Sequence, residues 1–182
     1  MKNFILAAMG LLLCSGMWAQ ELSVSTNILD YVNMGTINVG AAYGFARHWS
    51  AEAGVKYNPF SFGKGDAEKS LKQRNISAGL RWWPWHIYSG WWAGGRLQYQ
   101  EYSRAGFRDK SSTEGDRYGG VIAVGYSYML GPHFNLDFGA GLWGGYDRYV
   151  TYECQHCGRR TGEGNKVFLL PNDILLTFSY IF

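Results

Sequence analysis

The sequence predicts an all-β protein, a closed eight-stranded antiparallel up-and-down β-barrel that spans a membrane. Eight segments alternate apolar residues with small or polar ones at a period of two, which indicates strands with two different faces. Short turns and long polar connections both occur, as in transmembrane barrels with short periplasmic turns and longer extracellular loops. The closing segment, 174–182, alternates strictly, ends on Phe182 and is long enough to cross a bilayer as a strand.

Length and composition fit a single barrel domain. The chain has 182 residues, of which 25 are glycine and only 4 are proline, and 17% are aromatic. Such a composition suits many closely packed strands that carry large, flat side chains. The formal net charge of +3 is too small to indicate nucleic-acid binding.

Residues 1–19 have the features of a secretory signal peptide, so residues 20–182 form the predicted outer-membrane barrel domain. Lys2 supplies the positive charge, residues 4–13 form the apolar core, and Ala19 precedes the expected cleavage site. Cys14 follows an apolar run, as the lipidated cysteine of a lipoprotein does. Leu13 stands where that signal has a small residue, so we expect Cys14 to leave with the leader.

The first four predicted strands are 22–31, 36–45, 49–57 and 73–83. Their apolar faces carry, in order, Leu22, Val24 and Ile28; Ile37, Val39 and Tyr43; Ala51, Val55 and Tyr57; and Ile76, Leu80 and Trp82. Short turns join the first three strands, and a long polar loop, 58–72, precedes the fourth.

The last four predicted strands are 91–102, 117–130, 134–152 and 174–182. Their apolar faces carry, in order, Ala93, Leu97 and Tyr99; Ile122, Val124 and Tyr126; Phe134, Leu136 and Phe138; and Ile174, Leu176 and Phe178. Long polar loops are predicted over 103–116 and 153–166. An even number of strands that close on themselves leaves no unpaired edge in lipid.

The opposite faces of these strands are rich in glycine and carry Asn, Ser, Arg and Glu. We therefore expect an apolar outside and a polar inside, the reverse of a soluble barrel. A barrel-interior charge network is predicted from Glu52, Lys56, Arg81, Arg96 and Asp137. Its members should pair, because an unpaired buried charge would cost several kcal/mol. An eight-stranded interior has room only for side chains, so the barrel is expected to be plugged.

Tryptophans crowd the connection between the fourth and fifth predicted strands. They are Trp82, Trp83, Trp85, Trp91 and Trp92. Since Trp and Tyr gather where a membrane meets water, this cluster predicts an aromatic belt at the periplasmic interface. Both chain ends are expected on the same periplasmic side.

The segment Cys154-Gln-His-Cys157 is the one motif with chemistry of its own. A disulfide between Cys154 and Cys157 is the main expectation in an exported protein. Partial metal binding and free thiols remain open, although a structural zinc site needs four ligands and Cys154, His156 and Cys157 supply three. No metal site, cofactor or catalytic residue is predicted.

Two segments resemble an uncharacterised family of outer-membrane barrels, a domain of unknown function common in Bacteroidetes. They are Gln73–Arg104, with Trp82-Trp-Pro-Trp-His-Ile-Tyr-Ser-Gly-Trp-Trp, and the end of the chain, from Glu153-Cys-Gln-His-Cys-Gly onward. Leu170-Pro-Asn-Asp173 departs from the Gly-Pro-Thr-Lys stretch typical of that family. The resemblance implies eight strands and an outer-membrane location, implies no activity, and includes members associated with fimbrial gene clusters.

The last strand also resembles the C-terminal insertion signal of bacterial outer-membrane barrels. Phe178, Tyr180 and Phe182 are its expected recognition residues for the barrel assembly machinery. We expect a non-enzymatic membrane anchor, surrounded by outer-membrane lipid, whose outer loops contact an envelope or fimbrial protein. The alternative is an outer-membrane lipid-modifying enzyme of the acyltransferase or deacylase type. For it, His156 is the only histidine expected on the outer rim, and no serine lies in a suitable position beside it.

Overall fold

The computed structural model describes residues 22–33, 35–62, 69–105, 111–153 and 159–182. Its elements are β1 (Leu22–Asn27), α2 (Ile28–Val32), β2 (Ile37–Ala46), β3 (Trp49–Asn58), β4 (Ser61–Phe62), β5 (Lys69–Trp82), β6 (Gly90–Ala105), β7 (Ser112–Met129), β8 (Phe134–Tyr152) and β9 (Arg160–Ile181). The described chain is thus nearly all β, with one short helix.

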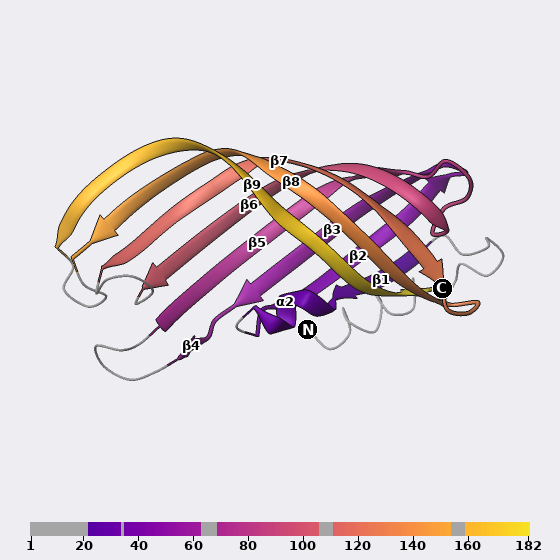
Figure 1. Cartoon of the computed structure of the whole chain (residues 1–182), viewed down its shortest axis with the longest axis horizontal. Helices are drawn as coiled ribbons and strands as arrows, with labels where there is room; N and C mark the ends of the chain where they lie inside the picture. Colours follow the sequence, from indigo (N-terminus) through magenta and orange to yellow (C-terminus); the bar gives the residue numbers. More distant parts are fainter. Residues whose placement is uncertain (1–21, 34, 63–68, 106–110, 154–158) are drawn as a thin grey trace, which may run out of the picture.

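The strands form one closed barrel (Figure 1). Neighbours pair in the order β3-β2-β1-β9-β8-β7-β6-β5, and β3 also pairs with β5, which closes the ring of eight. Every pairing is antiparallel, and β4 is a short addition to β5 outside the ring. The predicted eight-stranded antiparallel barrel is confirmed. The N–H of Phe182 donates to the carbonyl of Leu22, so the first and last described residues meet at one end.

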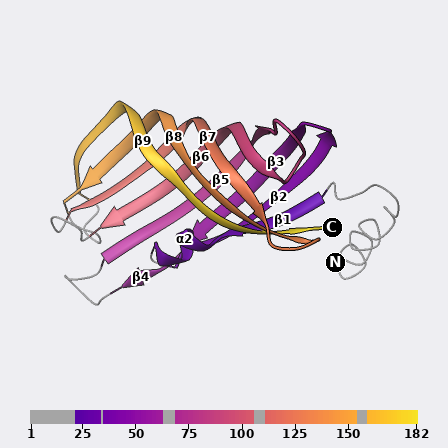
Figure 2. The same cartoon turned by 45° about the vertical axis from the view of Figure 1, so that its right-hand side comes forward.

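The strands are strongly inclined to the barrel axis (Figure 2). One row of register partners shows the size of the stagger: Asn38, Lys56, Asn75, Gln100, Arg117, Asp147 and Lys166. Followed from Asn38 through β3 and β5–β8, the row reaches β9 at Lys166. Followed the other way, through Asn27 beside Asn38 on β1, it reaches β9 at Thr177, far along the same strand. A closed barrel requires such a stagger, and the stagger sets the tilt of its strands.

The predicted long loops are mostly strand. β5 begins at Lys69, β6 continues to Ala105, β7 begins at Ser112 and β9 begins at Arg160, so the loops expected over 58–72, 103–116 and 153–166 are much shorter. These extensions carry polar residues on both faces, so the apolar-polar alternation that predicts a strand is missing from them. Their backbones nevertheless remain paired, as far as Ala105 with Ser112. The prediction of their bounds was wrong for that reason.

The first strand ends early, at Asn27, and the predicted strand 22–31 is wrong beyond that point. The side-chain Oδ1 of Asn27 accepts from the N–H of Leu29, which caps α2 in place of another strand residue. The same oxygen accepts from the N–H of Leu176, on β9, at 3.1 Å. Asn27 therefore marks the point at which β1 and β9 separate.

Beyond this point β9 has a strand partner on one side only. Its pairs with β1 run from Thr177 to Ile181, whereas its pairs with β8 run from Arg160 to Tyr180. Pro171 lies in this singly paired stretch, next to a register shift opposite Gly141 and Leu142, a position where a missing N–H is tolerated. The end of the barrel where Leu22 and Phe182 meet is called the lower end, and the opposite end, at the left of Figure 1, is called the upper end. The upper ends of β5–β9 form a curved wall that extends past β1–β3 and α2 (Figure 1).

The two surfaces of the barrel wall differ in chemistry. The outer surface is apolar, with Leu97, Ile122 and Val167 each more than 70% exposed. The inner surface buries polar groups, among them Ser50, Asn135 and Asp147. This inside-out distribution is the reverse of a water-soluble barrel.

Candidate functional site: polar lumen and outer vestibule

Four of the five predicted interior charges form one cluster in the lower lumen. The Arg81 Nε lies 2.6 Å from the Glu52 carboxylate, an ion-pair contact that is not aligned as a hydrogen bond. Arg81 Nη1 donates to Asp137 at 3.3 Å, and Arg96 Nη1 lies 3.7 Å from Glu52. Asp137 also accepts from Ser127. The cluster therefore places two guanidinium groups against two carboxylates, the compensation that buried charges require.

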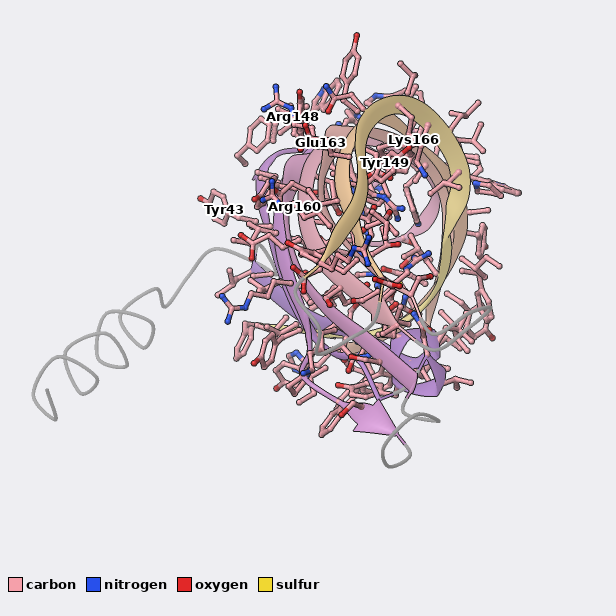
Figure 3. The ribbon with its side chains drawn as sticks, turned by 90° about the vertical axis from the view of Figure 1, so that its left-hand side faces the viewer. Tyr43, Arg148, Tyr149, Arg160, Glu163 and Lys166 are labelled. Carbon is pink, nitrogen blue, oxygen red and sulfur yellow. The ribbon has the colours of Figure 1, made fainter. Side chains whose placement is uncertain are left out.

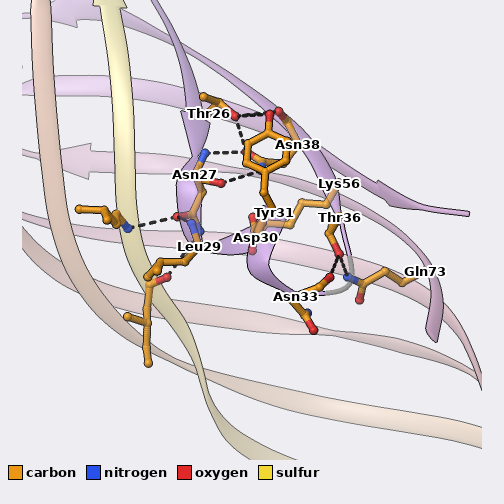
Figure 4. Close-up of polar contacts among 12 residues, drawn as sticks. Thr26, Asn27, Leu29, Asp30, Tyr31, Asn33, Thr36, Asn38, Lys56 and Gln73 are labelled. Carbon is orange, nitrogen blue, oxygen red and sulfur yellow. Dashed lines mark hydrogen bonds and ion pairs between the residues drawn. The ribbon is translucent and has the colours of Figure 1, made fainter. Parts of the chain in front are cut away.

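Lys56, the fifth predicted member, forms a separate pair. Its Nζ lies 2.8 Å from the carboxylate of Asp30 on α2 (Figure 4). The helix replaces the predicted continuation of the first strand, so the sequence pattern did not indicate Asp30 as a partner. The pair fastens α2 to the barrel wall beside the separation of β1 and β9.

The lower end of the lumen is closed by aromatic side chains. Trp83 and Trp92 are 1% and 3% exposed, and Tyr88 packs edge-on against Trp83. The Arg81 guanidinium carbon lies 4.1 Å from the Trp92 ring centroid, a cation–π contact. Tyr88 has a φ of 63°, and its carbonyl accepts hydrogen bonds from Ser127 and Asn135. The β5–β6 connection is thus folded inward as a plug.

The predicted aromatic belt is wrong for Trp83 and Trp92. Adjacent residues of a strand point to opposite faces, so in each Trp-Trp pair one ring must face the lumen. Trp82, Trp85 and Trp91 are 44%, 61% and 57% exposed on the outside. The prediction followed the high local density of tryptophan. It overlooked the alternation of the strands, which assigns Trp83 and Trp92 to the interior.

Other aromatic residues form a partial girdle at each edge of the apolar outer surface. At the end where the termini meet, Phe134 stacks with Phe178, and Tyr180 packs edge-on against Phe182. The three residues of the predicted insertion signal, Phe178, Tyr180 and Phe182, are all exposed there. Farther up the wall, the register row Tyr99, Tyr118 and Tyr146 places three exposed tyrosines side by side.

Above the second girdle the outer surface becomes charged. The next outward row comprises Arg74, Glu101, Asp116 and Arg148. The Tyr99 hydroxyl donates to both Glu101 and Asp116, so the tyrosine girdle is hydrogen-bonded to the charged row. The apolar surface therefore has a sharp upper boundary.

A second charge cluster occupies the upper lumen. Asp147 has no exposed surface and accepts from Tyr102 at 2.8 Å and from Arg117 Nε at 3.0 Å. Lys166 Nζ lies 3.5 Å from the same carboxylate, while its side chain remains 54% exposed. The Arg117 guanidinium carbon lies 4.1 Å from the Tyr102 ring centroid. Asp147 is thus the single acidic centre of a predominantly cationic cluster.

Sequence reasoning missed this upper cluster, although a signal for it was present. Asp147 lies within the predicted strand 134–152 and shares the parity of Asp137, which was assigned to the interior. Arg117 begins another predicted strand. Continuing the alternation to the ends of both strands would have placed the pair in the lumen.

Above the second cluster lies a large open vestibule, with a cavity volume of about 920 Å³. One inward-facing register row of β3 and β5–β9 lines it: Asn58, Gln73, Tyr102, Gly115, Tyr149 and Gly164. A Cβ on Gly115 would approach the Tyr102 hydroxyl to 2.8 Å, and one on Gly164 would approach the Tyr149 hydroxyl to 3.0 Å. Each tyrosine therefore lies across a glycine of the next strand.

Amide side chains connect one wall of this vestibule to the barrel interior. Gln100 donates to Gln73, and both Gln73 and Asn58 donate to the Thr36 hydroxyl. Tyr149 and Lys166 lie within the arch of β9, whereas Arg148 lies outside the wall (Figure 3). Aromatic rings with a few fixed polar groups are the usual lining of a ligand site.

Several predicted features fall outside the described residues. These are the signal peptide over 1–19, the cysteines Cys154 and Cys157, and His156 of the enzyme alternative. Within the described ranges, no group of three or more His, Cys, Asp and Glu residues could hold a metal ion. The same ranges contain no helix long and apolar enough to cross a membrane.

The fold and this polar interior define a small closed β-barrel with an apolar exterior. The sequence matches the family described as "Protein of unknown function (DUF3575)" over residues 4–182, and the chain belongs to that family. No curated protein matches the chain.

Proposed function

We propose that the protein is a non-enzymatic outer-membrane barrel that serves as an anchor and presents its upper wall for interaction outside the cell. One observation carries the proposal: an apolar outer surface lies between two aromatic girdles, around a polar lumen that aromatic side chains close at its lower end. From Tyr118 to Tyr128, β7 rises about 34 Å at about 3.4 Å per residue. Tilted by about 40°, that length spans roughly 25 Å, the height of the apolar band in transmembrane barrels.

The direction of insertion follows from the asymmetry of the two ends. The end where Leu22 and Phe182 meet has short connections, and the opposite end carries the extended β5–β9 wall. Outer-membrane barrels have short periplasmic turns and longer extracellular loops, so the termini lie in the periplasm and the wall outside. Outer-membrane lipid surrounds the apolar surface, and the barrel assembly machinery recognises the last strand during insertion.

The wall and vestibule, rather than the lumen, supply the interaction surface. The lower lumen is occupied by Arg81, Trp83 and Trp92, which supports an anchor rather than a channel. An envelope or fimbrial protein is the candidate partner of the wall and the loops above it.

Two measurements test this proposal. Sodium carbonate washing should leave the protein in the membrane fraction. Single cysteines replacing Thr113 on the upper wall and Pro132 on the opposite rim, in a background without Cys154 and Cys157, should respond differently to an impermeant maleimide. Labelling at position 113 and protection at position 132 in intact cells are expected. Equal labelling, or release by carbonate, would contradict the proposed orientation or anchoring.

Cross-linking from the same upper position identifies the partner. A photo-reactive residue at Thr113 should capture a discrete envelope component in intact cells, and one at Pro132 should not capture it. Capture from both positions alike would argue against a specific outer interaction surface.

A further inference from the structure

The upper lumen and vestibule contain more positive than negative charge on their inward face. Arg104 and Arg117 both lie against the Tyr102 ring, with guanidinium carbons 5.5 Å and 4.1 Å from its centroid. Arg117 and Lys166 share the one buried carboxylate, Asp147. Two cations therefore contact one carboxylate and a third lies against the neighbouring tyrosine, which leaves a local excess of positive charge where the vestibule meets its floor.

The acidic residues that border the vestibule have other partners. Glu101 and Asp116 accept from the Tyr99 hydroxyl on the outer surface. Ser103 donates to Glu114, and Arg160 pairs with Glu163 at 3.8 Å. These carboxylates occupy outward register positions, so they offset little of the positive charge inside.

The remaining lining suits a polyhydroxylated ligand. Tyr149 is partly buried, and its ring is positioned by Lys166, whose Nζ lies 5.0 Å from the ring centroid. Gln73 supplies a partly exposed amide group on the opposite part of the same row, while the buried Asn58 beside it holds Thr36. Aromatic surfaces together with fixed amides and cations can contact the ring faces, hydroxyl groups and anionic substituents of one ligand.

We propose that the vestibule binds an anionic saccharide. Tyr149, which lines the cavity, would contact a sugar ring, and Arg104 and Lys166, whose charged groups flank the cavity beside the rings of Tyr102 and Tyr149, would contact the charged groups of the ligand. A cavity of about 920 Å³ accommodates a ligand of disaccharide size. This inference rests on the proposed function, since it names the ligand class of the outward-facing vestibule. The same chemistry occurs in a phosphorylated glycolipid headgroup and in a free phosphorylated glycan.

The test uses the full mature chain in lipid nanodiscs and a bisphosphorylated glucosamine disaccharide as the probe. Calorimetric titration should show binding that weakens as salt screens the charges, and the unphosphorylated disaccharide should bind at least about tenfold more weakly. Arg104→Gln and Lys166→Gln should each lower the affinity about tenfold, the loss expected for one charge-assisted hydrogen bond. Arg47→Gln, which removes an exposed cation in the β2–β3 turn at the opposite end of the barrel, should change it less than about twofold.

A second arm distinguishes the source of the ligand. Nanodiscs that contain the acylated bisphosphorylated glycolipid should compete with the free disaccharide if the headgroup is the natural ligand. No competition, with binding of the free probe intact, assigns the site to a free glycan.

Two results overturn the inference: equal binding of the neutral disaccharide, or an Arg47→Gln loss as large as that of Arg104→Gln. Failure to bind by a barrel that inserts and passes the surface-labelling test overturns this inference alone. Failure to insert overturns the proposed function instead.

Discussion

Arg117 and Asp147 face each other across β7 and β8, with the Nε of Arg117 3.0 Å from the Oδ2 of a carboxylate that has no exposed surface. Tyr102 donates to the other oxygen of the same carboxylate. The pair joins two neighbouring strands and also supports the floor of the vestibule, so stability and site geometry depend on the same contact.

Replacing Asp147 by Asn should destabilise the barrel strongly. Removing one partner leaves Arg117 as an uncompensated buried charge, and such losses cost about 3–5 kcal/mol. Urea unfolding in lipid vesicles, followed by the shift of the folded band on unheated gels, measures the change. Asp116→Asn, the adjacent outward-facing acid, is the control and should cost less than about 1 kcal/mol.

The double replacement Arg117→Met with Asp147→Leu tests whether charge compensation is the cause. It should be less destabilising than Asp147→Asn alone, because neither charge remains unpaired. If the loss of unfolding free energy in the double variant equals the sum of the losses in Arg117→Met and Asp147→Leu measured singly, this explanation is contradicted.

The two members of the Trp82-Trp83 pair should respond differently to replacement by alanine. Trp83 is 1% exposed and its Nε1 donates to Ser50, so Trp83→Ala removes a core ring and should cost about 3–5 kcal/mol. Trp82 is 44% exposed on the outer surface, and its replacement should cost clearly less. Brominated lipids give an independent readout, since bromine quenches tryptophans that contact lipid. The fraction of tryptophan fluorescence that bromine quenches should fall in Trp82→Ala, which loses a quenched ring, and should not fall in Trp83→Ala. Equal quenching of both contributions would contradict the opposite orientations.

The plug predicts an absence of channel activity. Trp83, Tyr88 and Trp92 close the lower end of the lumen, and Arg81 is held between Glu52 and Asp137 beside them. Purified protein in planar bilayers should give no stable single-channel currents. The variant Tyr88→Ala removes the ring that packs on Trp83 and donates to the Ala42 carbonyl, so brief currents should appear. Stable currents from the unaltered protein would disprove a closed lumen.

Deletion of Phe182 should impair assembly of the barrel in the membrane. The residue is 59% exposed, packs against Tyr180 and donates its N–H to Leu22, where the last strand meets the first. The amount of folded, heat-modifiable protein in the outer-membrane fraction measures the effect. Phe182→Tyr keeps an aromatic ring and should assemble normally. Normal assembly of the deletion variant would count against an insertion signal.

The alternation of apolar and polar residues was enough to predict the ring of eight strands and which face of each strand is outside. It failed where its physical cause is missing. Above the tyrosine girdle both faces of β5–β9 meet water, so residues such as Arg104 and Glu114 carry no periodic contrast although their backbones remain paired. Asn27 illustrates a second limit, since the oxygen that caps α2 also accepts from Leu176, which is 149 positions away and beyond the reach of any local pattern.

Among the predicted site residues, chemical type was a better guide than local density. Arg81, Glu52 and Asp137 come together because each charge lies on an inward position of a regular strand. Lys56 instead pairs with Asp30, whose position depends on the helix that ends the first strand. Cys154 and Cys157 lie outside the described residues, so the disulfide between them stays a prediction.

The one-sided pairing of β9 above Asn27 has a consequence for the direction from which a ligand approaches. Because β1–β3 end well below the upper ends of β8 and β9, the upper rim of the barrel is oblique to the barrel axis (Figure 1). With its apolar band in a bilayer, the opening of such a barrel faces along the membrane surface. A molecule anchored in the outer leaflet could then enter by lateral diffusion, without first leaving the lipid that holds it.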